Sequence, residues 1–255
     1  MCIHVDQELK STKLESKDPE LIRSPFTASG IAIGDVDGDG ASDIYVASRT
    51  GGGRLFKNMG DFNFRDVTSA MAIELKSMWG TSPTMVDVND DGLLDIYLCC
   101  YNSPNRLFIN RGRKFREQSE RFGLDFSGAS TQAAFADYDG DGDLDLYLVT
   151  NRLIPRNPDK KIPVDRVPGE RPRIPEEFRE QNRLIQHRDG SYRGIASGQF
   201  DRLYRNEGYR FVDVTEETGI GKHACLLYTS PSPRDCGPDL VCRLLLENGG
   251  GGGGG

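Results

Sequence analysis

The sequence predicts an all-β protein made of about three repeated four-stranded units, and three observations support this prediction. A nine-residue acidic pattern, Asp-x-Asp/Asn-x-Asp-Gly-x-x-Asp, occurs at residues 35–43, 87–95 and 137–145. The first aspartates of successive copies are 52 and then 50 residues apart. Each copy leads into an apolar run, and an Arg-Leu-(Phe/Tyr)-x-Asn segment comes later in each unit. A repeat of this length with four strand-like segments is typical of a β-propeller blade.

The acidic pattern has the features of a calcium-binding loop. Oxygen ligands at positions 1, 3 and 5 converge on a hard cation because a glycine at position 6 permits the sharp turn; a carbonyl at position 7 and a carboxylate at position 9 would complete the shell. The rival interpretation, an EF-hand, requires a glutamate at position 12 and flanking helices. Position 12 is instead Val46, Leu98 or Leu148, within runs suited to a buried strand. We therefore expect strand-loop-strand units.

The elements of each predicted blade follow in the same order. The strands that lead into the loops are expected at residues 31–33, 84–86 and 133–135, and those that leave them at 44–47, 96–99 and 146–149. The third strands are expected at 54–58, 106–110 and 202–206, and the last at 64–68, 115–118 and 211–215. Between these two, a glycine follows the asparagine by two residues and suits a tight hairpin (Gly60, Gly112, Gly208).

These loops and hairpins resemble the FG-GAP/VCBS repeats of integrin-α-like and cartilage-acidic-protein-like β-propellers, over roughly residues 26–221. The resemblance implies about three Ca²⁺ ions, each rigidifying a loop between the first two strands of a blade. It also implies a role in adhesion, secreted matrix or cell-surface assemblies. The implied ligands are Asp35, Asp37, Asp39, Ala41 and Asp43; Asp87, Asn89, Asp91, Leu93 and Asp95; and Asp137, Asp139, Asp141, Asp143 and Asp145.

The ends of the chain carry three further expectations. Three units fall short of the roughly four to eight blades that close a propeller, so a propeller fragment is expected. Residues 1–25 form a polar N-terminal segment without the apolar core of a signal peptide. Residues 225–255 look like a translated sequencing adapter followed by a poly-glycine run, Gly249–Gly255. We expect this tail to be non-native; a genuine flexible tail is the alternative.

The third unit contains a long insertion. From Asp145 to Arg202 the chain uses 57 residues, where the other copies use 11, so residues of about 152–200 are expected to project from the blade. A helix is predicted from Pro175 to about His187, because proline suits the first helical position and acidic residues suit the first turn. Long loops of this kind are either recognition elements or solvated, partly disordered excursions.

Recurring side chains have structural explanations. A tyrosine at one blade position is expected to pack between blades (Tyr45, Tyr97, Tyr147). A recurring arginine is expected to bond carbonyls or acids of a neighbouring blade (Arg54, Arg106, Arg202). Cys99 and Cys100 are expected to be buried free thiols, because adjacent Cα atoms lie closer than a disulfide normally requires.

Composition excludes several functions. The net charge of −7 is concentrated in the loops, and no basic stripe with stacking aromatics indicates nucleic-acid binding. No apolar run is long enough for membrane insertion. Ser197 lacks a nucleophile-elbow spacing, and residues 51–53 precede a strand rather than a helix. We expect a non-enzymatic extracellular, periplasmic or cell-surface module for an unknown protein or glycan ligand; the alternative is part of a carbohydrate-active enzyme.

Overall fold

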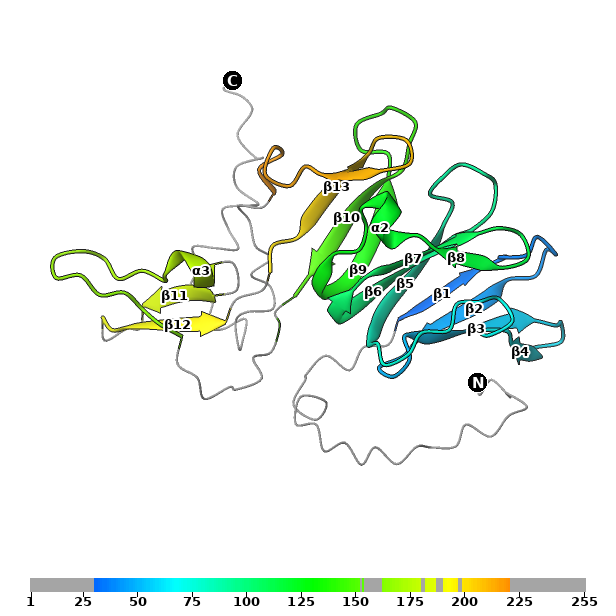
Figure 1. The fold of residues 1–255 in the computed structure, drawn as a ribbon, viewed down its shortest axis with the longest axis horizontal. Coiled ribbons are helices and arrows are strands. Elements are labelled where there is room, and N and C mark those ends of the chain that lie inside the picture. Colours follow the sequence, from blue (N-terminus) through cyan, green and yellow to red (C-terminus); the bar gives the residue numbers. More distant parts are fainter. Residues whose placement is uncertain are drawn as a thin grey trace, which may run out of the picture.

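A computed structural model describes residues 30–151, 153, 162–179, 182–186, 190–196 and 199–220. Within these residues the protein is all-β apart from two single-turn helices, which confirms the predicted class. The strands form three four-stranded units that stand side by side (Figure 1). The expected N-terminal segment, residues 1–25, and the expected non-native tail, residues 225–255, lie outside the described residues.

Unit 1 is a sheet of four antiparallel strands that pair in chain order. Its strands are β1 (Ile31–Gly34), β2 (Asp43–Ala47), β3 (Gly53–Asn58) and β4 (Phe64–Asp66). All four lie where the sequence predicts them, but β4 ends at Asp66 instead of Thr68. The reason is that the Thr68 hydroxyl accepts the backbone N–H of Leu55 at 3.0 Å, so a side chain replaces the next strand-to-strand bond.

Units 2 and 3 repeat this arrangement. Unit 2 contains β5 (Gly80–Val86), β6 (Asp95–Pro104), β7 (Arg106–Asn110) and β8 (Phe115–Glu117). Unit 3 contains β9 (Ser127–Ala136), β10 (Asp145–Thr150), β13 (Arg202–Asn206) and β14 (Phe211–Asp213). One short helix after β8, α2 (Ser119–Phe122), was not predicted. It ends at Gly123, whose φ of +72° suits a helix C-terminus.

Strands β5, β6 and β9 are longer than the sequence predicts, and the extended parts of β6 and β9 join units 2 and 3. The first half of β6 pairs with β5 and β7, whereas its second half pairs with β9 through Tyr101↔Ala129 and Pro104↔Ser127. Units 2 and 3 therefore share one curved eight-stranded sheet, while unit 1 keeps a separate sheet (Figure 1).

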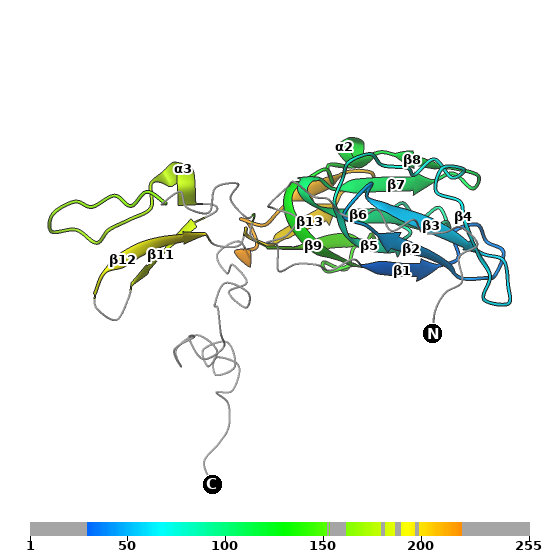
Figure 2. The ribbon, with the colours of Figure 1, turned by 90° about the horizontal axis from the view of Figure 1, so that it is seen from below.

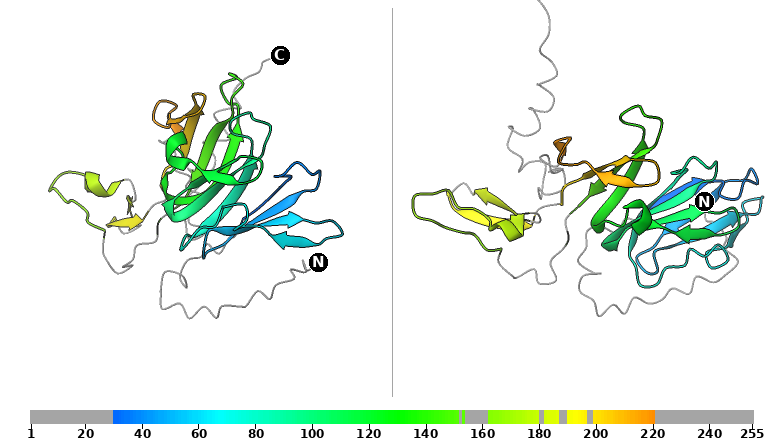
Figure 3. Two further views of the ribbon diagram at one scale, coloured as in Figure 1. Left: turned by 45° about the vertical axis from the view of Figure 1, so that its right-hand side comes forward. Right: turned by 45° about the horizontal axis from the view of Figure 1, so that its top comes forward.

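The insertion in unit 3 forms a β-hairpin, and the helix predicted from Pro175 to His187 is wrong over most of its length. The helix α3 spans Glu176–Arg179 only, and the chain then pairs β11 (Asn182–Gln186) with β12 (Tyr192–Ala196). Pairing of β11 with β12 provides hydrogen-bond partners for backbone N–H and C=O groups that a short, highly charged helix would leave bonded to water. The stability of this pairing outweighs the helix-start signals at Pro175. Figures 2 and 3 show this hairpin standing apart from the three units.

The core lies between the units rather than inside any one of them. Units 1 and 2 meet in a buried cluster that includes Tyr45 and Leu55 from one and Ile96 and Phe108 from the other. Units 2 and 3 meet in an equivalent buried cluster, which includes Val88, Tyr97, Leu107, Leu146, Leu148 and Tyr204. Tyr45 and Tyr97 are fully buried in these clusters, as predicted, whereas Tyr147 is half-buried. Stacking of successive units therefore buries the apolar surface.

Two further sequence expectations have clear outcomes. Cys99 and Cys100 are both free and buried, as predicted. The recurring arginines, however, pair with acids of their own unit instead of a neighbouring one, through Arg54–Asp66 at 2.7 Å, Arg106–Glu117 at 3.5 Å and Arg202–Asp213 at 2.6 Å. Pairing of the third and fourth strands places each arginine beside the acid at the end of the next strand, which explains the difference.

Candidate metal centres in three acidic loops

Three acidic loops connect the first two strands of the three units, and we call them loop 1 (35–43), loop 2 (87–95) and loop 3 (137–145). The glycine at position 6 has a φ of +87°, +82° or +98° in Gly40, Gly92 and Gly142. Side chains other than glycine are strained there, which explains the glycine in each copy. The sequence prediction of a sharp turn at this position is confirmed.

The first aspartate holds each loop in its turn by accepting backbone N–H groups. Asp35 accepts those of Gly38 and Gly40 at 2.8 Å each. Asp87 accepts the N–H of Gly92 at 2.7 Å, and Asp137 accepts that of Gly142 at 3.1 Å. These bonds bend the chain around the carboxylate. The loops therefore share one set of turn bonds, made by a carboxylate within each loop.

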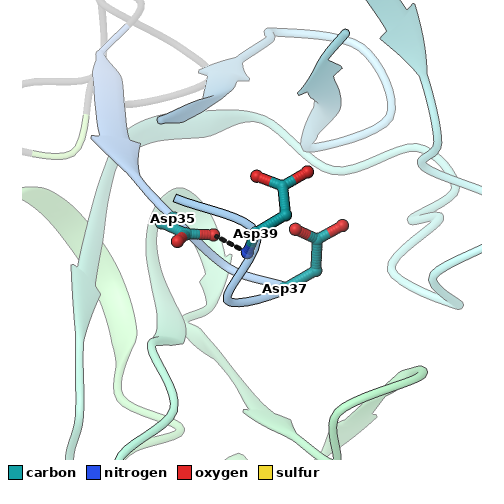
Figure 4. A group of neighbouring side chains, drawn as sticks. All are labelled: Asp35, Asp37 and Asp39. Carbon is teal, nitrogen blue, oxygen red and sulfur yellow. Dashed lines mark hydrogen bonds between the residues drawn. The ribbon is translucent and has the colours of Figure 1, made fainter. Parts of the chain in front are cut away.

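Loop 1 brings three predicted ligands together. Asp35, Asp37 and Asp39 each offer a carboxylate oxygen within 4.8 Å of the others, and Figure 4 shows the Asp37 and Asp39 carboxylates on the same side of the loop. One oxygen of Asp37, Oδ1, is buried without a hydrogen-bond partner. A buried carboxylate oxygen without a donor is costly, so this atom fits a site for a cation.

Loop 1 also contacts a basic side chain from β3. The Lys57 ammonium pairs with Asp37 and lies 2.9 Å from Asp39 Oδ2. The Lys57 hydrogen bond lowers the pKa of Asp39 below its usual value, and the two aspartates raise the pKa of Lys57. Sequence reasoning missed this lysine, because it lies outside the acidic pattern and 20 residues after Asp37.

Loop 2 has the same turn with an asparagine at position 3. The Asn89 side-chain Nδ2 donates to Asp91 at 3.0 Å, and its Oδ1 accepts the backbone N–H of Asp91 at 3.1 Å. Arg111 approaches Asp91 at 3.9 Å, with half of its side chain exposed. The predicted oxygen ligands of loop 2 therefore lie in one turn, and the basic neighbour of this turn is the half-exposed Arg111.

Loop 3 gathers a different set of three predicted ligands. Asp137, Asp139 and Asp145 each offer an oxygen within 4.8 Å of the others. Burial, followed by the neighbouring charge of Asp141, raises the pKa of Asp139. Among the residues described by the structure, no lysine or arginine forms an ion pair with an aspartate of this loop. Within that part of the chain, loop 3 thus concentrates negative charge without a basic ion-pair partner.

The ninth-position aspartate is buried and has a second role that the sequence did not reveal. Asp43 accepts the backbone N–H of Val36 at 3.2 Å and of Asn58 at 2.8 Å. Its counterparts in the other units make the equivalent bonds, Asp95 with Val88 and Asn110, and Asp145 with Tyr138 and Asn206. Burial raises the pKa of Asp43 and raises that of Asp95 to about 7, while these N–H donors act in the opposite direction.

The asparagine at the end of each third strand completes this clamp. Besides its backbone N–H, its side-chain Nδ2 donates at 3.1 Å to the carbonyl at loop position 8, in the pairs Asn58–Ser42, Asn110–Leu94 and Asn206–Leu144. Asn110 also donates to the Val36 carbonyl of loop 1 at 2.7 Å, which ties unit 2 to unit 1. The recurrence of asparagine in all three copies is the sequence signal that points to this role.

The residues at position 7 have a visible role only through their backbone N–H. In each loop it donates to the position-5 aspartate, from Ala41 to Asp39, from Leu93 to Asp91 and from Asp143 to Asp141, at 2.9 to 3.0 Å. Their expected role as carbonyl ligands stays a prediction. As a set, the loops present carboxylate, amide and carbonyl oxygens, the donors that Ca²⁺ prefers.

Comparison with known proteins agrees with the repeated units. A family model described as the FG-GAP-like repeat matches residues 35–98 and again residues 87–148, each match running from one loop to the next. The chain therefore carries FG-GAP-like repeats over residues 35–148.

Comparison with individual proteins gives a more specific similarity than the family model. The chain is 33% identical over 134 residues to cartilage acidic protein 1 from Xenopus tropicalis, which covers 51% of this chain and 20% of that protein. It is 29% identical over 124 residues to the human protein of the same name, covering 47% of this chain and 18% of that protein. The chain thus matches about a fifth of the length of these relatives.

Proposed function

We propose that the three units are blades of a calcium-stabilised β-propeller that serves binding or adhesion, without catalysis, in a secreted, periplasmic or cell-surface protein. About three Ca²⁺ ions would bind, one in each loop. The proposed ligands are the fifteen residues predicted from the sequence: Asp35, Asp37, Asp39, Ala41 and Asp43; Asp87, Asn89, Asp91, Leu93 and Asp95; and Asp137, Asp139, Asp141, Asp143 and Asp145.

The observation that carries this proposal is the repetition of one loop geometry three times at the same place in successive units. In each copy the glycine turn lies beside a buried aspartate that anchors the next strand, and in loops 1 and 3 three carboxylates come together. Bound calcium would offset the repulsion among these carboxylates and would hold the ends of the first two strands in place. The match to FG-GAP-like repeats supports the same interpretation.

The proposed partner is a protein or a glycan. In the described residues, no helix is both long and apolar enough to span a membrane. The relatives are named for cartilage, an extracellular matrix, which supports placing the whole protein outside the cytoplasm. A propeller supports such a role because it holds many loops rigidly on one scaffold.

Calcium titration tests the proposal. Isothermal titration calorimetry of the full chain should show about three sites in the micromolar to millimolar range typical of sensor and extracellular sites. Because calcium binds the folded state, it should also raise Tm, and EDTA should lower it again. Magnesium at the same concentration is the control, since its smaller octahedral shell fits these loops less well. Absence of both heat and a Tm shift with calcium would contradict the proposal.

A further inference from the structure

The three loops differ in their basic neighbours, although their own sequences are nearly the same. In loop 1, Lys57 pairs with both Asp37 and Asp39, and about a quarter of its side chain is exposed. In loop 2 the nearest basic group is Arg111, 3.9 Å from Asp91 and half-exposed. In unit 3, Arg205 forms its ion pair with Glu207, at 2.6 Å.

The difference arises at one position of the third strand. In each unit one residue directly precedes the asparagine that ends the third strand: Lys57, Ile109 or Arg205. The three side chains therefore occupy the same register position. Ile109 is fully buried in the core between units 2 and 3. The lysine at this position has a side chain long enough to reach the mouth of loop 1 with its ammonium group, while the isoleucine leaves loop 2 open.

We infer that Lys57 acts as a built-in cation of loop 1, which makes loop 1 the weakest of the three calcium sites. This inference rests on the proposed calcium function. The ammonium satisfies two of the carboxylates that calcium would use, so calcium must displace it before binding. Loop 2 has only the half-exposed Arg111 at 3.9 Å, and loop 3 has no basic ion-pair partner among the described residues, so neither has a closely bound ammonium to displace. Lys57 therefore already neutralises part of the carboxylate charge of loop 1, whereas loops 2 and 3 depend on calcium for this.

The physical basis is competition for the same oxygens. An ammonium and a Ca²⁺ ion cannot both approach the Asp37 and Asp39 carboxylates closely, because like charges at such distances repel. An ammonium offers hydrogen bonds but cannot gather the six to eight oxygens that calcium takes, so calcium still wins at high concentration. Part-exposed ion pairs are weak, so the expected penalty is about tenfold in affinity rather than a complete block.

The experiment follows each loop separately in the full chain. The amide of the position-6 glycine bonds to the first aspartate of its own loop, so Gly40, Gly92 and Gly142 are three local probes. Their ¹⁵N–¹H signals are recorded during a CaCl₂ titration of the wild type, of Lys57→Ile and of Arg205→Ile. The Lys57→Ile change copies the residue that unit 2 already holds. Arg205→Ile is the matched control, because Arg205 forms its ion pair with Glu207 instead of a loop aspartate.

In the wild type, the Gly40 signal should respond at about tenfold higher calcium than the Gly92 and Gly142 signals. Lys57→Ile should move the Gly40 midpoint into the range of the other two, and Arg205→Ile should move none. If Gly40 responds together with the others in the wild type, or if its midpoint ignores Lys57→Ile, the inference is wrong. If no glycine signal responds to calcium in any variant, the proposed function itself fails.

Thermal melting gives a second readout that does not depend on NMR assignment. In EDTA, Lys57→Ile should have a lower Tm than the wild type, because the loop 1 carboxylates lose their cation; calcium should raise the Tm of the variant by more than that of the wild type. Lys57→Gln, which keeps a long polar side chain, should behave in the same way. A calcium-induced rise in Tm that is equal in all three proteins would overturn the inference.

Discussion

Asp43 shows that one carboxylate has two roles in this protein. It is a proposed calcium ligand, and it also accepts the backbone N–H groups of Val36 and Asn58 at the point where loop 1 meets β3. Asp37 differs, because its ion pair is with the side chain of Lys57 and not with backbone N–H groups of a strand. Substitutions at these two positions can therefore distinguish an effect on calcium binding from an effect on the stability of the calcium-free fold.

Substitution at these two positions should give different results in EDTA. Asp43→Ala leaves two backbone N–H groups without their acceptor in a buried place, so it should lower the free energy of unfolding by about 2 kcal/mol even without calcium. Asp37→Ala should cost less than about 1 kcal/mol, because it removes a part-exposed ion pair. Both should abolish calcium binding at loop 1 and spare the other two loops.

Urea denaturation in EDTA and calorimetric titration with calcium measure the two effects. Equal destabilisation by both substitutions would show that the N–H bonds of Asp43 contribute little. Loss of all three calcium sites in either variant would show that the loops are coupled rather than local.

At the scale of elements, the insertion of unit 3 leaves and rejoins the sheet at neighbouring positions. The backbone N–H of Gln199 donates to the Asn151 carbonyl at 3.0 Å, so the two ends of the insertion already meet. The hairpin packs on itself: Ile174 is buried, and Gly194 lies so close to Ile162 and Ile174 that a Cβ there would clash. The insertion therefore acts as an appendage.

We expect that replacing residues 153–196 with a four-residue glycine-serine linker leaves the fold intact. The Tm should change by less than about 3 °C, because the ends need no rearrangement and the three units keep their contacts. Gln199→Ala is the matched comparison: it removes the acceptor of the Ala129 N–H bond, 2.6 Å long, and should cost about 1 to 2 kcal/mol.

Circular dichroism melts of the three proteins decide between these outcomes. A large drop in Tm on replacing the hairpin, beyond that of Gln199→Ala, would show that the insertion supports the sheet.

At the scale of the whole molecule, the two outer units each present an open face. Ile31 is 61% exposed in unit 1, whereas the residues at the same place in units 2 and 3, Pro83 and Ala133, are buried. At the other end Tyr138 is 44% exposed, whereas its counterparts Val36 and Val88 are 3% exposed. Within the chain, each face of this kind packs against the next unit, so the exposed copies are apolar surfaces without that cover.

We therefore expect residues 26–221, expressed alone, to self-associate. Ile33, which is 65% exposed on the open face of unit 1, is the site to test. Ile33→Lys should shift the protein toward monomer, because a lysine there opposes burial of the face. Val167→Lys, a change at a 42% exposed residue in the insertion, should leave association unchanged.

Size-exclusion chromatography with light scattering over a range of concentrations measures the result. A stable, monodisperse monomer from the unchanged protein at every concentration would show that these faces need no partner.

Much of the fold could be predicted because its signals are local. The strands of the three units, the loop glycines and the hairpin glycines lie at the predicted places along the chain, since turn geometry and alternating burial depend on a few adjacent positions. The proposed ligands follow for the same reason, because an acidic loop holds its own donors within nine residues. The helix expected at Pro175 shows the limit, since its start signals were outweighed by pairing with a distant strand.

The sequence by itself determined the repeat, the all-β class and the three acidic loops, because each depends on residues close together along the chain. The tertiary structure decided which arginine pairs with which acid, that β6 extends to join β9, and that Asp43 anchors β3. It also decided that Lys57 reaches loop 1 while Ile109 is buried. These contacts join residues distant in sequence, so they exist only after the strands have paired and the units have stacked.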